Sequence, residues 1–403
     1  MTEVFTGSFT QQEPICDEGI AAAVEVMRHG RLHRYNTVAG EISHTALLEE
    51  EFAAFTGAKY ALAVASGGYA IGAALRAAGV QHGDRVLTNA FTLAPVPGAI
   101  ASVGGIPDLV EVTEGLVVDL DHLEAKAATG QSKYLLLSHM RGHICDMDRL
   151  MAICNAHGII VIEDCAHTMG ATFKGIQSGR HGLIGCYSTQ TYKHMNSGEG
   201  GFLVTDDAET MARAIILSGS YMLYERHRAA PPPEVFERVK YVTPNISGRM
   251  DNLRAAILRP QLVHLQSNIE AWNLRYKTVE DIVGRSPHAT MIERKGQFVG
   301  SSIQFRVKDA SPDWAEGFLS RLAERGVVVS WFGGAEPQGF TSSEKQWRYL
   351  GRQSAPQAGE ILSTLFDMRL PLSFSVDDCA LIADIIVDEL TAPAESKVPG
   401  GKR

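Results

Sequence analysis

The sequence lacks the long apolar run that a membrane-spanning helix requires. Such a helix needs roughly eighteen or more consecutive apolar residues, and the most apolar stretch, residues 61–80, is interrupted by glycines, Ser66 and Arg76. Residues 1–19 have no basic segment followed by an apolar one, which is the pattern of a signal peptide. We therefore predict no signal peptide, no transmembrane helix and no membrane partner.

Cysteine is scarce. The six cysteines of the 403 residues are scattered, and none forms a Cys-x-x-Cys pair. Such cysteines are typical of reduced, mostly buried thiols, which predicts a cytoplasmic location rather than a disulfide-stabilised secreted protein. His139, His143 and Cys145 are an alternative set of metal ligands. Because no second cluster at ligand spacing accompanies them, we predict no metal site.

Basic residues are outnumbered by acidic ones. The chain has 37 Lys and Arg against 46 Asp and Glu, and its formal net charge is −9. This balance argues against a nucleic-acid-binding protein and against a polybasic membrane-surface patch. Hydrophobic residues make up 45% and charged residues 21%, as in ordinary globular proteins. At about 150 residues per domain, the length predicts two to three domains, or one large α/β domain with a smaller partner.

Short apolar runs alternate with helical patterns through the first half of the chain. This alternation is typical of a mainly parallel sheet covered by helices on both faces, so we predict an α/β fold. Ligands of such sheets bind beyond the carboxyl ends of the strands. The predicted strands are residues 60–65, 85–88, 106–111, 134–137, 159–163, 185–188 and 202–205, and helices between them include residues 69–78, 94–103 and 146–157.

The second half of the chain begins with a long helical pattern over residues 251–282. This pattern contains Pro260, which would either sit within the helix or kink it. Mixed strand and helix patterns follow. The sequence thus predicts a large domain with an N-terminal arm (1–250), a smaller α+β domain with the linking helix (251–391), and a disordered tail (392–403). The predicted elements of the smaller domain are strands 302–307 and 327–331 and helices 312–325 and 377–390.

Three polar features follow predicted strands. Asp164 ends an apolar strand, where a buried carboxylate requires a cation or hydrogen-bond donors. Lys193 lies in a polar loop after a later strand, and Ser66, Gly67 and Gly68 join the first strand to a helix whose N–H groups would bind phosphate. Each feature alone has an ordinary explanation: a turn aspartate, an exposed lysine and a tight turn.

Together these features match what pyridoxal 5′-phosphate (PLP) requires. Lys193 would form a Schiff base with the aldehyde of PLP. Asp164 would pair with the pyridinium nitrogen and keep it protonated, so that the ring accepts electrons. The helix start after Ser66 would hold the phosphate. The combination therefore predicts a PLP site.

At these residues the chain resembles the DegT/StrS family of PLP-dependent sugar aminotransferases, over roughly residues 30–390. The resemblance implies the fold-type-I (aspartate aminotransferase) architecture, with a large PLP domain and a smaller C-terminal one. It also implies a ping-pong transfer of an amino group from glutamate or glutamine to a keto-sugar or sugar-like ketone. The motifs that carry it are 65–68 (Ala-Ser-Gly-Gly), 83–86 (Gly-Asp-Arg-Val), 145–148 (Cys-Asp-Met-Asp), 163–167 (Glu-Asp-Cys-Ala-His), 187–193 (Tyr-Ser-x-x-x-x-Lys), 198–201 (Gly-Glu-Gly-Gly) and 248–257.

By position, the resemblance implies PLP-binding roles for several residues. Lys193 is the Schiff-base lysine and the acid-base group, Asp164 pairs with the pyridine nitrogen, and His167 hydrogen-bonds near the phenolic oxygen. Leu93 stands where the family usually has the aromatic that stacks on the ring, and His194 replaces the usual asparagine. The phosphate ligands are Ser66, Gly67, Gly68 and Ser188, with Gly68 in place of a usual threonine.

The resemblance further implies a homodimer with active sites shared between subunits. In this family an asparagine of the neighbouring subunit often completes the phosphate site, and Asn245 or the nearby Ser247 would take that role here. We expect the loop of residues 243–249, with Arg249, at the subunit interface.

Four residues are candidates for substrate binding: Arg141, His143, Arg226 and Arg249. An arginine beyond a strand end can bind a carboxylate through two hydrogen bonds, or it can form an ordinary surface ion pair. An acidic keto-sugar of the octulosonate type is therefore an alternative to a sugar nucleotide or a cyclitol ketone. Another PLP reaction, a dehydration or a lyase reaction, is the alternative to transamination. Lys193 favours transamination, because the dehydrating branch of the family has histidine there.

Overall fold

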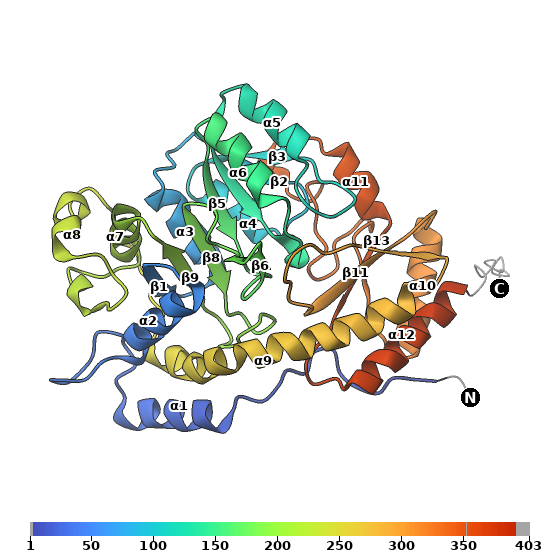
Figure 1. The fold of residues 1–403 in the computed structure, drawn as a ribbon, viewed down its shortest axis with the longest axis horizontal. Helices are drawn as coiled ribbons and strands as arrows, with labels where there is room; N and C mark the ends of the chain where they lie inside the picture. Colours follow the sequence, from blue (N-terminus) through green and yellow to red (C-terminus); the bar gives the residue numbers. More distant parts are fainter. Residues whose placement is uncertain (1–2, 352, 392–403) are drawn as a thin grey trace, which may run out of the picture.

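The structure, a computed structural model, describes residues 3–351 and 353–391. Its larger sheet has seven strands in the order β1-β9-β8-β5-β4-β2-β3 (Figure 1). β9 is antiparallel to both of its neighbours and the other neighbouring pairs are parallel, which confirms the predicted α/β class. The strands are β1 (Tyr60–Val64), β2 (Arg85–Asn89), β3 (Ile106–Val110), β4 (Ser132–Ser138), β5 (Ile160–Asp164), β8 (Ile184–Ser188) and β9 (Gly201–Thr205).

Helices cover both faces of this sheet because its strands are apolar on both sides. Successive side chains of a strand point to opposite faces, and in β4 Leu135 and Leu137 join one buried cluster whereas Leu136 joins the other. The first cluster includes residues of α2 (His44–Thr56), α5 (Leu120–Ala128), α6 (Met147–Ala156) and α9 (Asn252–Val283). The second includes residues of α3 (Gly67–Ala77), α4 (Pro95–Ser102), α7 (Ala208–Leu217) and α8 (Pro233–Val239).

The smaller sheet has four antiparallel strands in the order β10-β11-β13-β12. A third buried cluster joins this sheet to the C-terminal half of α9, to two further helices and to the N-terminal side chains Phe5 and Phe9. The strands are β10 (Ala289–Met291), β11 (Ser302–Val307), β12 (Ser330–Trp331) and β13 (Leu365–Arg369), and the helices are α10 (Pro312–Glu324) and α12 (Val376–Thr391). The other described elements are α1 (Asp17–His29), α11 (Pro356–Ser363), the hairpin β6 (Thr172–Phe173) and β7 (Ile176–Gln177), and three short 3-10 turns.

Helix α9 connects the two sheets, and in Figure 1 it runs along the lower side of both. Leu258 and Leu265 belong to the core of the larger sheet, whereas Tyr276 and Val283 belong to the core of the smaller one. The helix continues through Pro260, so the proline is accommodated within it. One helix therefore contributes to both hydrophobic cores.

Most predicted elements are present, and the differences have local causes. The predicted strand at 327–331 is reduced to β12 (Ser330–Trp331), and Val328 within that segment is 56% exposed. Helices α1, α2, α5, α7, α8 and α11 and strands β6, β7, β10 and β13 were not predicted. β6, β7 and β10 have only two or three residues each, too few to show the alternation that marks a strand. The predicted tail, 392–403, lies outside the described residues.

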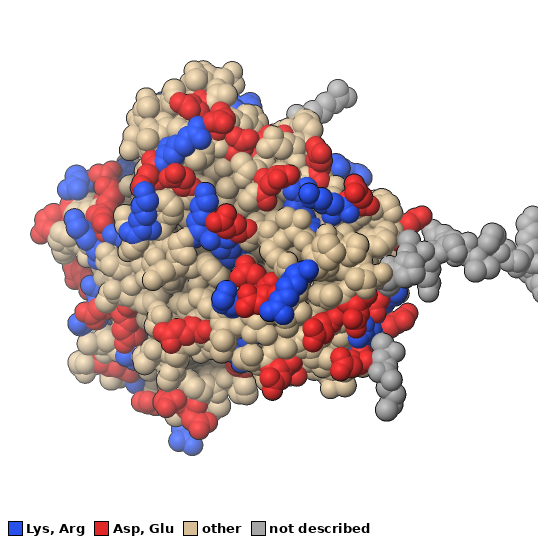
Figure 2. Space-filling model, turned by 45° about the vertical axis from the view of Figure 1, so that its right-hand side comes forward, with Lys and Arg blue, Asp and Glu red and all other residues tan. Residues whose placement is uncertain are grey.

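Charged side chains of both signs are intermixed on the face of the molecule shown in Figure 2. This distribution agrees with the small excess of acidic residues in the sequence. None of the described helices combines the length and the apolarity needed to cross a bilayer.

A buried ionic network ties the N-terminal segment to the larger sheet. Arg34 donates two hydrogen bonds of 2.7 Å to the carboxylate of Glu49 in α2. The same carboxylate accepts a hydrogen bond from the backbone N–H of Ala63 in β1 and lies 3.2 Å from Nδ1 of His227. Burial alone would raise the pKa of Glu49, but the charges of Arg34 and His227 lower that pKa to about 2.

We expect the substitution Glu49→Ala to destabilise the fold strongly. It leaves the buried charge of Arg34 without a countercharge and the Ala63 N–H without an acceptor, and breaking a buried pair in this way costs about 3–5 kcal/mol. The matched control is Glu50→Ala, which removes the exposed partner of Arg228 from the same helix and should change the free energy of unfolding little. Urea denaturation of both variants measures the difference. Equal losses would show that the network does not stabilise the fold.

Candidate active site

A cavity of about 440 Å³ lies where the carboxyl ends of five strands of the larger sheet meet. Residues after β1, β2, β4, β5 and β8 line one side, as expected for an open α/β sheet. Residues of the smaller sheet and its loops line the other side. Nine of the predicted site residues line this cavity: Ser66, Gly67, Gly68, Leu93, Arg141, Asp164, His167, Ser188 and Lys193.

Asp164 is the last residue of β5, and its side chain is buried at the cavity. Oδ2 accepts a hydrogen bond from the Ser138 hydroxyl at 3.0 Å, and Oδ1 accepts one from the backbone N–H of Ala166 at 3.1 Å. Burial raises the pKa of Asp164, although these two hydrogen bonds and the charge of Lys193 act in the opposite direction. A cationic group bound in the cavity would compensate this carboxylate.

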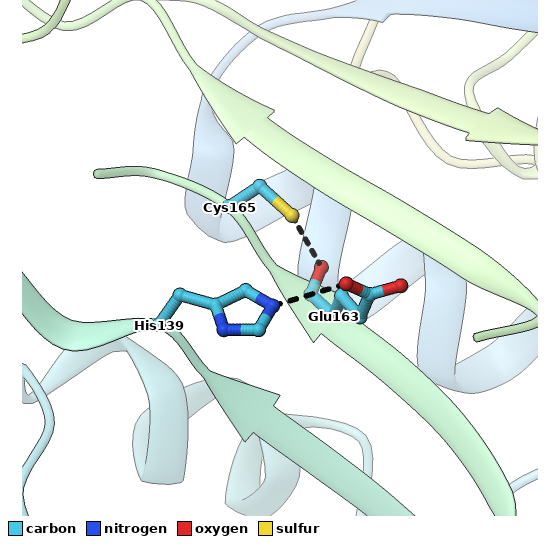
Figure 3. Close-up of side chains that lie close together, drawn as sticks. All are labelled: His139, Glu163 and Cys165. Carbon is cyan, nitrogen blue, oxygen red and sulfur yellow. Dashed lines mark hydrogen bonds and ion pairs between the residues drawn. The ribbon is translucent and has the colours of Figure 1, made fainter. Parts of the chain in front are cut away.

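A second buried carboxylate, Glu163, lies on the opposite face of the same strand, beside His139 and Cys165 (Figure 3). The ligand atoms of these three side chains lie within 4.8 Å of one another. However, Glu163 accepts four hydrogen bonds, from His139 Nε2 and from the backbone N–H groups of residues 179, 181 and 182. This carboxylate therefore fastens the loop 179–182 to β5, directly behind Asp164. His143 and Cys145, the other members of the alternative ligand set, are not in the group.

Lys193 Nζ lies 2.8 Å from Nε2 of His167 inside the cavity. The backbone N–H of Arg141 donates to Nδ1 of His167 at 3.2 Å, so the proton of the neutral imidazole is on Nε2. That proton can be donated to Lys193 only if the amine has a free electron pair. Burial and the charge of Arg141 lower the pKa of Lys193 to about 7, against the opposing effect of Asp164. The surroundings therefore favour the neutral, nucleophilic amine.

The start of α3 forms a cradle for an anion. Ser66 is the N-cap, and its hydroxyl accepts a hydrogen bond from the backbone N–H of Tyr69. The first N–H groups of a helix have no partner within the helix and attract negative charge. A Cβ atom on Gly67 would lie 2.7 Å from Cβ of Ser188, whereas one on Gly68 would meet nothing within 4 Å. Only glycine at position 67 permits this close approach between the helix start and Ser188.

The cavity fits PLP in each of its chemical parts. The helix start and Ser188 suit a phosphate, the buried Asp164 suits a protonated ring nitrogen, and Lys193 suits an aldehyde. Apolar side chains between these groups suit the ring itself; they are Leu93, Val96, Met140 and Ala166. The wall at Leu93 is aliphatic, as the sequence predicts.

Of the four candidate substrate residues, only Arg141 lines the cavity. Its φ of 55° is unusual for a residue other than glycine, and its guanidinium forms a 2.8 Å ion pair with Asp367. The expectation for His143 is wrong for this cavity. That side chain is buried and lies 2.9 Å from Oε1 of Gln304, and burial with the nearby Arg294 lowers its pKa to about 3.

Arg226, Arg249 and Asn245 do not line the cavity of their own chain. The Arg226 guanidinium donates to the backbone carbonyl of Tyr35. Arg249 donates to the carbonyl of Gly219 at 2.7 Å and to the Ser247 hydroxyl at 3.0 Å. The loop that carries Asn245 nevertheless lies close to the cradle, because the N–H of Ala65 donates to the carbonyl of Gly248.

Several lining residues were not predicted. Tyr192, Gln190 and Glu199 flank Lys193 in sequence, and their polar loop was the only signal available. Ser301, Ser302, Phe340 and Arg369 come from the smaller sheet and its loops. Their distance from Lys193 along the chain exceeds one hundred residues, so no local pattern could have placed them at the site.

Comparisons with known proteins bear on this cavity. A sequence model of the DegT/DnrJ/EryC1/StrS aminotransferase family matches residues 15–363 of the chain. The chain is 30% identical over 286 residues to the 3-amino-5-hydroxybenzoate synthase of Amycolatopsis mediterranei. This alignment covers 69% of this chain and 71% of that protein. The chain is also 32% identical over 199 residues to the L-glutamine:scyllo-inosose aminotransferase of Streptomyces griseus. This second alignment covers 49% of this chain and 47% of that protein.

The fold is that of known fold-type-I PLP enzymes. The structure of E. coli GDP-4-keto-6-deoxy-D-mannose-3-dehydratase with bound hydrated PLP superposes with a TM-score of 0.80 at 20% identity, over 95% of this chain and 100% of that chain. Other curated relatives are 35–39% identical over segments that cover 40–44% of their own length. In those alignments the chain spans less than half of each relative.

We expect the amine of Lys193 to titrate far below an ordinary lysine in the cofactor-free chain. Its pKa of about 7 makes the nucleophilic fraction rise as the pH increases through 7. Trace acetylation as a function of pH, read by peptide mass spectrometry, measures this midpoint. The urea-unfolded chain is the control, because an unperturbed lysine has a pKa of about 10.4. The same midpoint in both states would contradict the burial argument.

Proposed function

Because the chain belongs to the DegT/DnrJ/EryC1/StrS aminotransferase family, we propose that it transfers an amino group, by means of PLP, from glutamine or glutamate to a ketone on a sugar or sugar-like ring. The observation that carries this proposal is the convergence of Lys193, Asp164 and the start of α3 on one cavity. These are the three groups that a PLP enzyme needs, and they come from three separate strand ends.

The residues of the chain divide the work of such a reaction. PLP, when bound, supplies an aldehyde for the amine and a cationic ring that takes up electrons from the substrate carbon. Lys193 would provide the nucleophilic amine and then move protons at the reacting carbon. Asp164, fixed by Ser138 and the Ala166 N–H, would hold the ring nitrogen protonated. His167 would orient Lys193, since its Nε2 lies 2.8 Å from the amine.

The names of relatives support a cyclic keto compound as the acceptor. One relative acts on scyllo-inosose with L-glutamine, and another is a 3-amino-5-hydroxybenzoate synthase. The acceptor of this chain is therefore proposed to be a polyhydroxylated ring ketone, with an acidic keto-sugar as the alternative. Transamination is favoured over dehydration because position 193 holds the lysine that would bind the aldehyde of PLP and move the proton during amino transfer.

We also propose that the enzyme is a homodimer with shared active sites. The loop of residues 243–249 borders the phosphate cradle from outside, through the contact of Gly248 with Ala65. Large apolar side chains are exposed around this loop, as expected of a surface that a partner subunit covers; they are Leu32, Tyr221, Met222, Tyr241, Val242 and Ile246. Asn245 lies on this surface and would reach the cradle of the partner.

Removal of the lysine tests the proposed reaction. We expect Lys193→Ala to lower the rate of amino transfer roughly a hundred- to ten-thousandfold, because both the nucleophile and the proton-transfer group are lost. The measurement is the formation of the 2-oxo product of L-glutamine or L-glutamate together with the aminated acceptor. Asp164→Asn should also lose most of the rate, but borohydride should still fix PLP to Lys193, as read by peptide mass.

The matched control is Lys174→Ala, since Lys174 is an exposed lysine paired with Asp148. This variant should retain the wild-type rate and the borohydride-fixed cofactor. Full turnover by Lys193→Ala would refute the assignment. Consumption of a ketone without transfer of nitrogen would favour dehydration.

Complementation between two inactive variants tests the shared site. If Asn245 serves the partner subunit, Asn245→Ala and Lys193→Ala homodimers should both be impaired, and mixed dimers should contain one intact site. We therefore expect part of the activity to return when the two variants are unfolded and refolded together. Variants mixed without refolding are the control. Failure to regain activity in heterodimers identified by native mass spectrometry would contradict the sharing of Asn245.

A further inference from the structure

Arg141 and Asp367 form a buried ion pair that joins the two sheets at the edge of the cavity. Arg141 follows β4 of the larger sheet, whereas Asp367 lies within β13 of the smaller one. Nη2 of the arginine is 2.8 Å from Oδ2 of the aspartate, and the side chains are only 9% and 3% exposed. Because a lone charge is costly at such depth, each group requires the other. The pair therefore ties the two walls of the cavity together.

Asp367 is itself fixed by Gln304 in β11. The Gln304 amide makes all four hydrogen bonds available to it. Nε2 donates to Oδ1 of Asp367 at 2.7 Å and to the Ser302 hydroxyl at 2.9 Å. Oε1 accepts hydrogen bonds of 2.9 Å from His143 and from Arg294. One carboxylate oxygen of Asp367 is thus held by the smaller sheet, and the other is left for the guanidinium.

The backbone of Arg141 leads from this pair to the reactive lysine. Its φ of 55° is strained for a residue other than glycine, and such a conformation persists only where the surrounding structure supports it. The N–H of Arg141 donates to Nδ1 of His167 at 3.2 Å, and Nε2 of His167 lies 2.8 Å from Nζ of Lys193. The contacts therefore run without a gap from Asp367 to the amine.

We propose that Arg141 and Asp367 are a positioning pair for Lys193 and that Arg141 is not a substrate ligand. Asp367 holds the guanidinium and balances its charge. The strained backbone that this side chain anchors holds His167 against the amine. The smaller sheet therefore influences the lysine as well as forming a wall of the cavity. This inference rests on the proposed function, which makes Lys193 the reactive group.

The charge of the pair matters because Lys193 has several charged and titratable neighbours. The two arginines among them disfavour its ammonium form, and Asp164 favours it. Burial lowers the pKa of both histidines among them, which keeps them neutral. Removing either member of the pair should therefore change the net charge at the lysine, in opposite directions. The neighbours are Asp164, Arg141, Arg369, His167, His194, Tyr192 and Glu199.

The titration of Lys193 in the full-length, cofactor-free chain tests the pair, by trace acetylation as a function of pH. Asp367→Asn keeps the shape of the side chain but leaves the charge of Arg141 uncompensated. We expect the midpoint to fall by about one pH unit, because added positive charge disfavours the ammonium form. Arg141→Gln leaves the negative charge of Asp367 instead, so the midpoint should rise by a similar amount. The double variant removes both charges and should return close to the wild-type midpoint.

The PLP-loaded enzyme provides a second readout. PLP bound to Lys193 changes its visible absorbance when the lysine nitrogen gains a proton, and the pH midpoint of this change should shift in the same order among the variants. The matched control is Glu389→Gln, which removes a carboxylate that pairs with Arg321 and Arg325 and does not line the cavity. It should leave both midpoints unchanged. Circular dichroism shows whether each variant folds, and either single variant decides the test if the other does not.

The outcomes separate this inference from the proposed function. Midpoints that rise in all three variants would show only that the cavity has opened, and unchanged midpoints would show that the pair does not act on the lysine. Either result refutes the inference. An unchanged midpoint in Arg141→Gln with a raised half-saturating concentration of the ring ketone would make Arg141 a substrate ligand. The expected shifts in a wild-type background that transfers no amino group would refute the proposed function alone.

Discussion

The site depends on the burial of an amine and a carboxylate in one cavity. Lys193 and Asp164 both lose most of their hydration there, which disfavours the charged form of each. The protein supports Asp164 with two hydrogen bonds and Lys193 with His167, and it positions the strand behind them through Glu163. A bound cationic ring and an aldehyde would satisfy both groups. The chemistry of the cavity thus follows from two polar groups that the fold leaves only partly compensated.

The sequence predicted those parts of the structure that leave a local pattern. Strands buried on both faces appear as continuous apolar runs, and Asp164, Ser188 and the Ser66–Gly68 turn lie directly after such runs. The lysine was identified because its position relative to these strands matched a known arrangement. The strand order, and hence the meeting of β1, β5 and β8, could not be read from one sequence, because it is set by contacts between distant segments.

The arginines show where sequence reasoning reaches its limit. Arg141 and His143 are two residues apart after the same strand, yet one faces the cavity and the other binds Gln304 in the interior. Arg141 has a positive φ, which a residue pattern does not reveal. The charge of Arg141 is paired with Asp367, a residue of the smaller sheet that is distant in the sequence. Which charges are paired is a property of the three-dimensional structure, and neither sequence segment alone contains it.

Helix α9 has a mechanical consequence for the two walls of the cavity. Because its two halves are embedded in different cores, the sheets cannot separate or rotate freely without deforming a common rod. A regular helix resists bending because every turn is braced by backbone hydrogen bonds, and Pro260, which cannot donate one, lies between two residues of the larger core, Leu258 and Leu265. Any opening and closing of the cavity would therefore have to bend the regular part of the helix between Trp272, the last residue in the larger core, and Tyr276, the first in the smaller one.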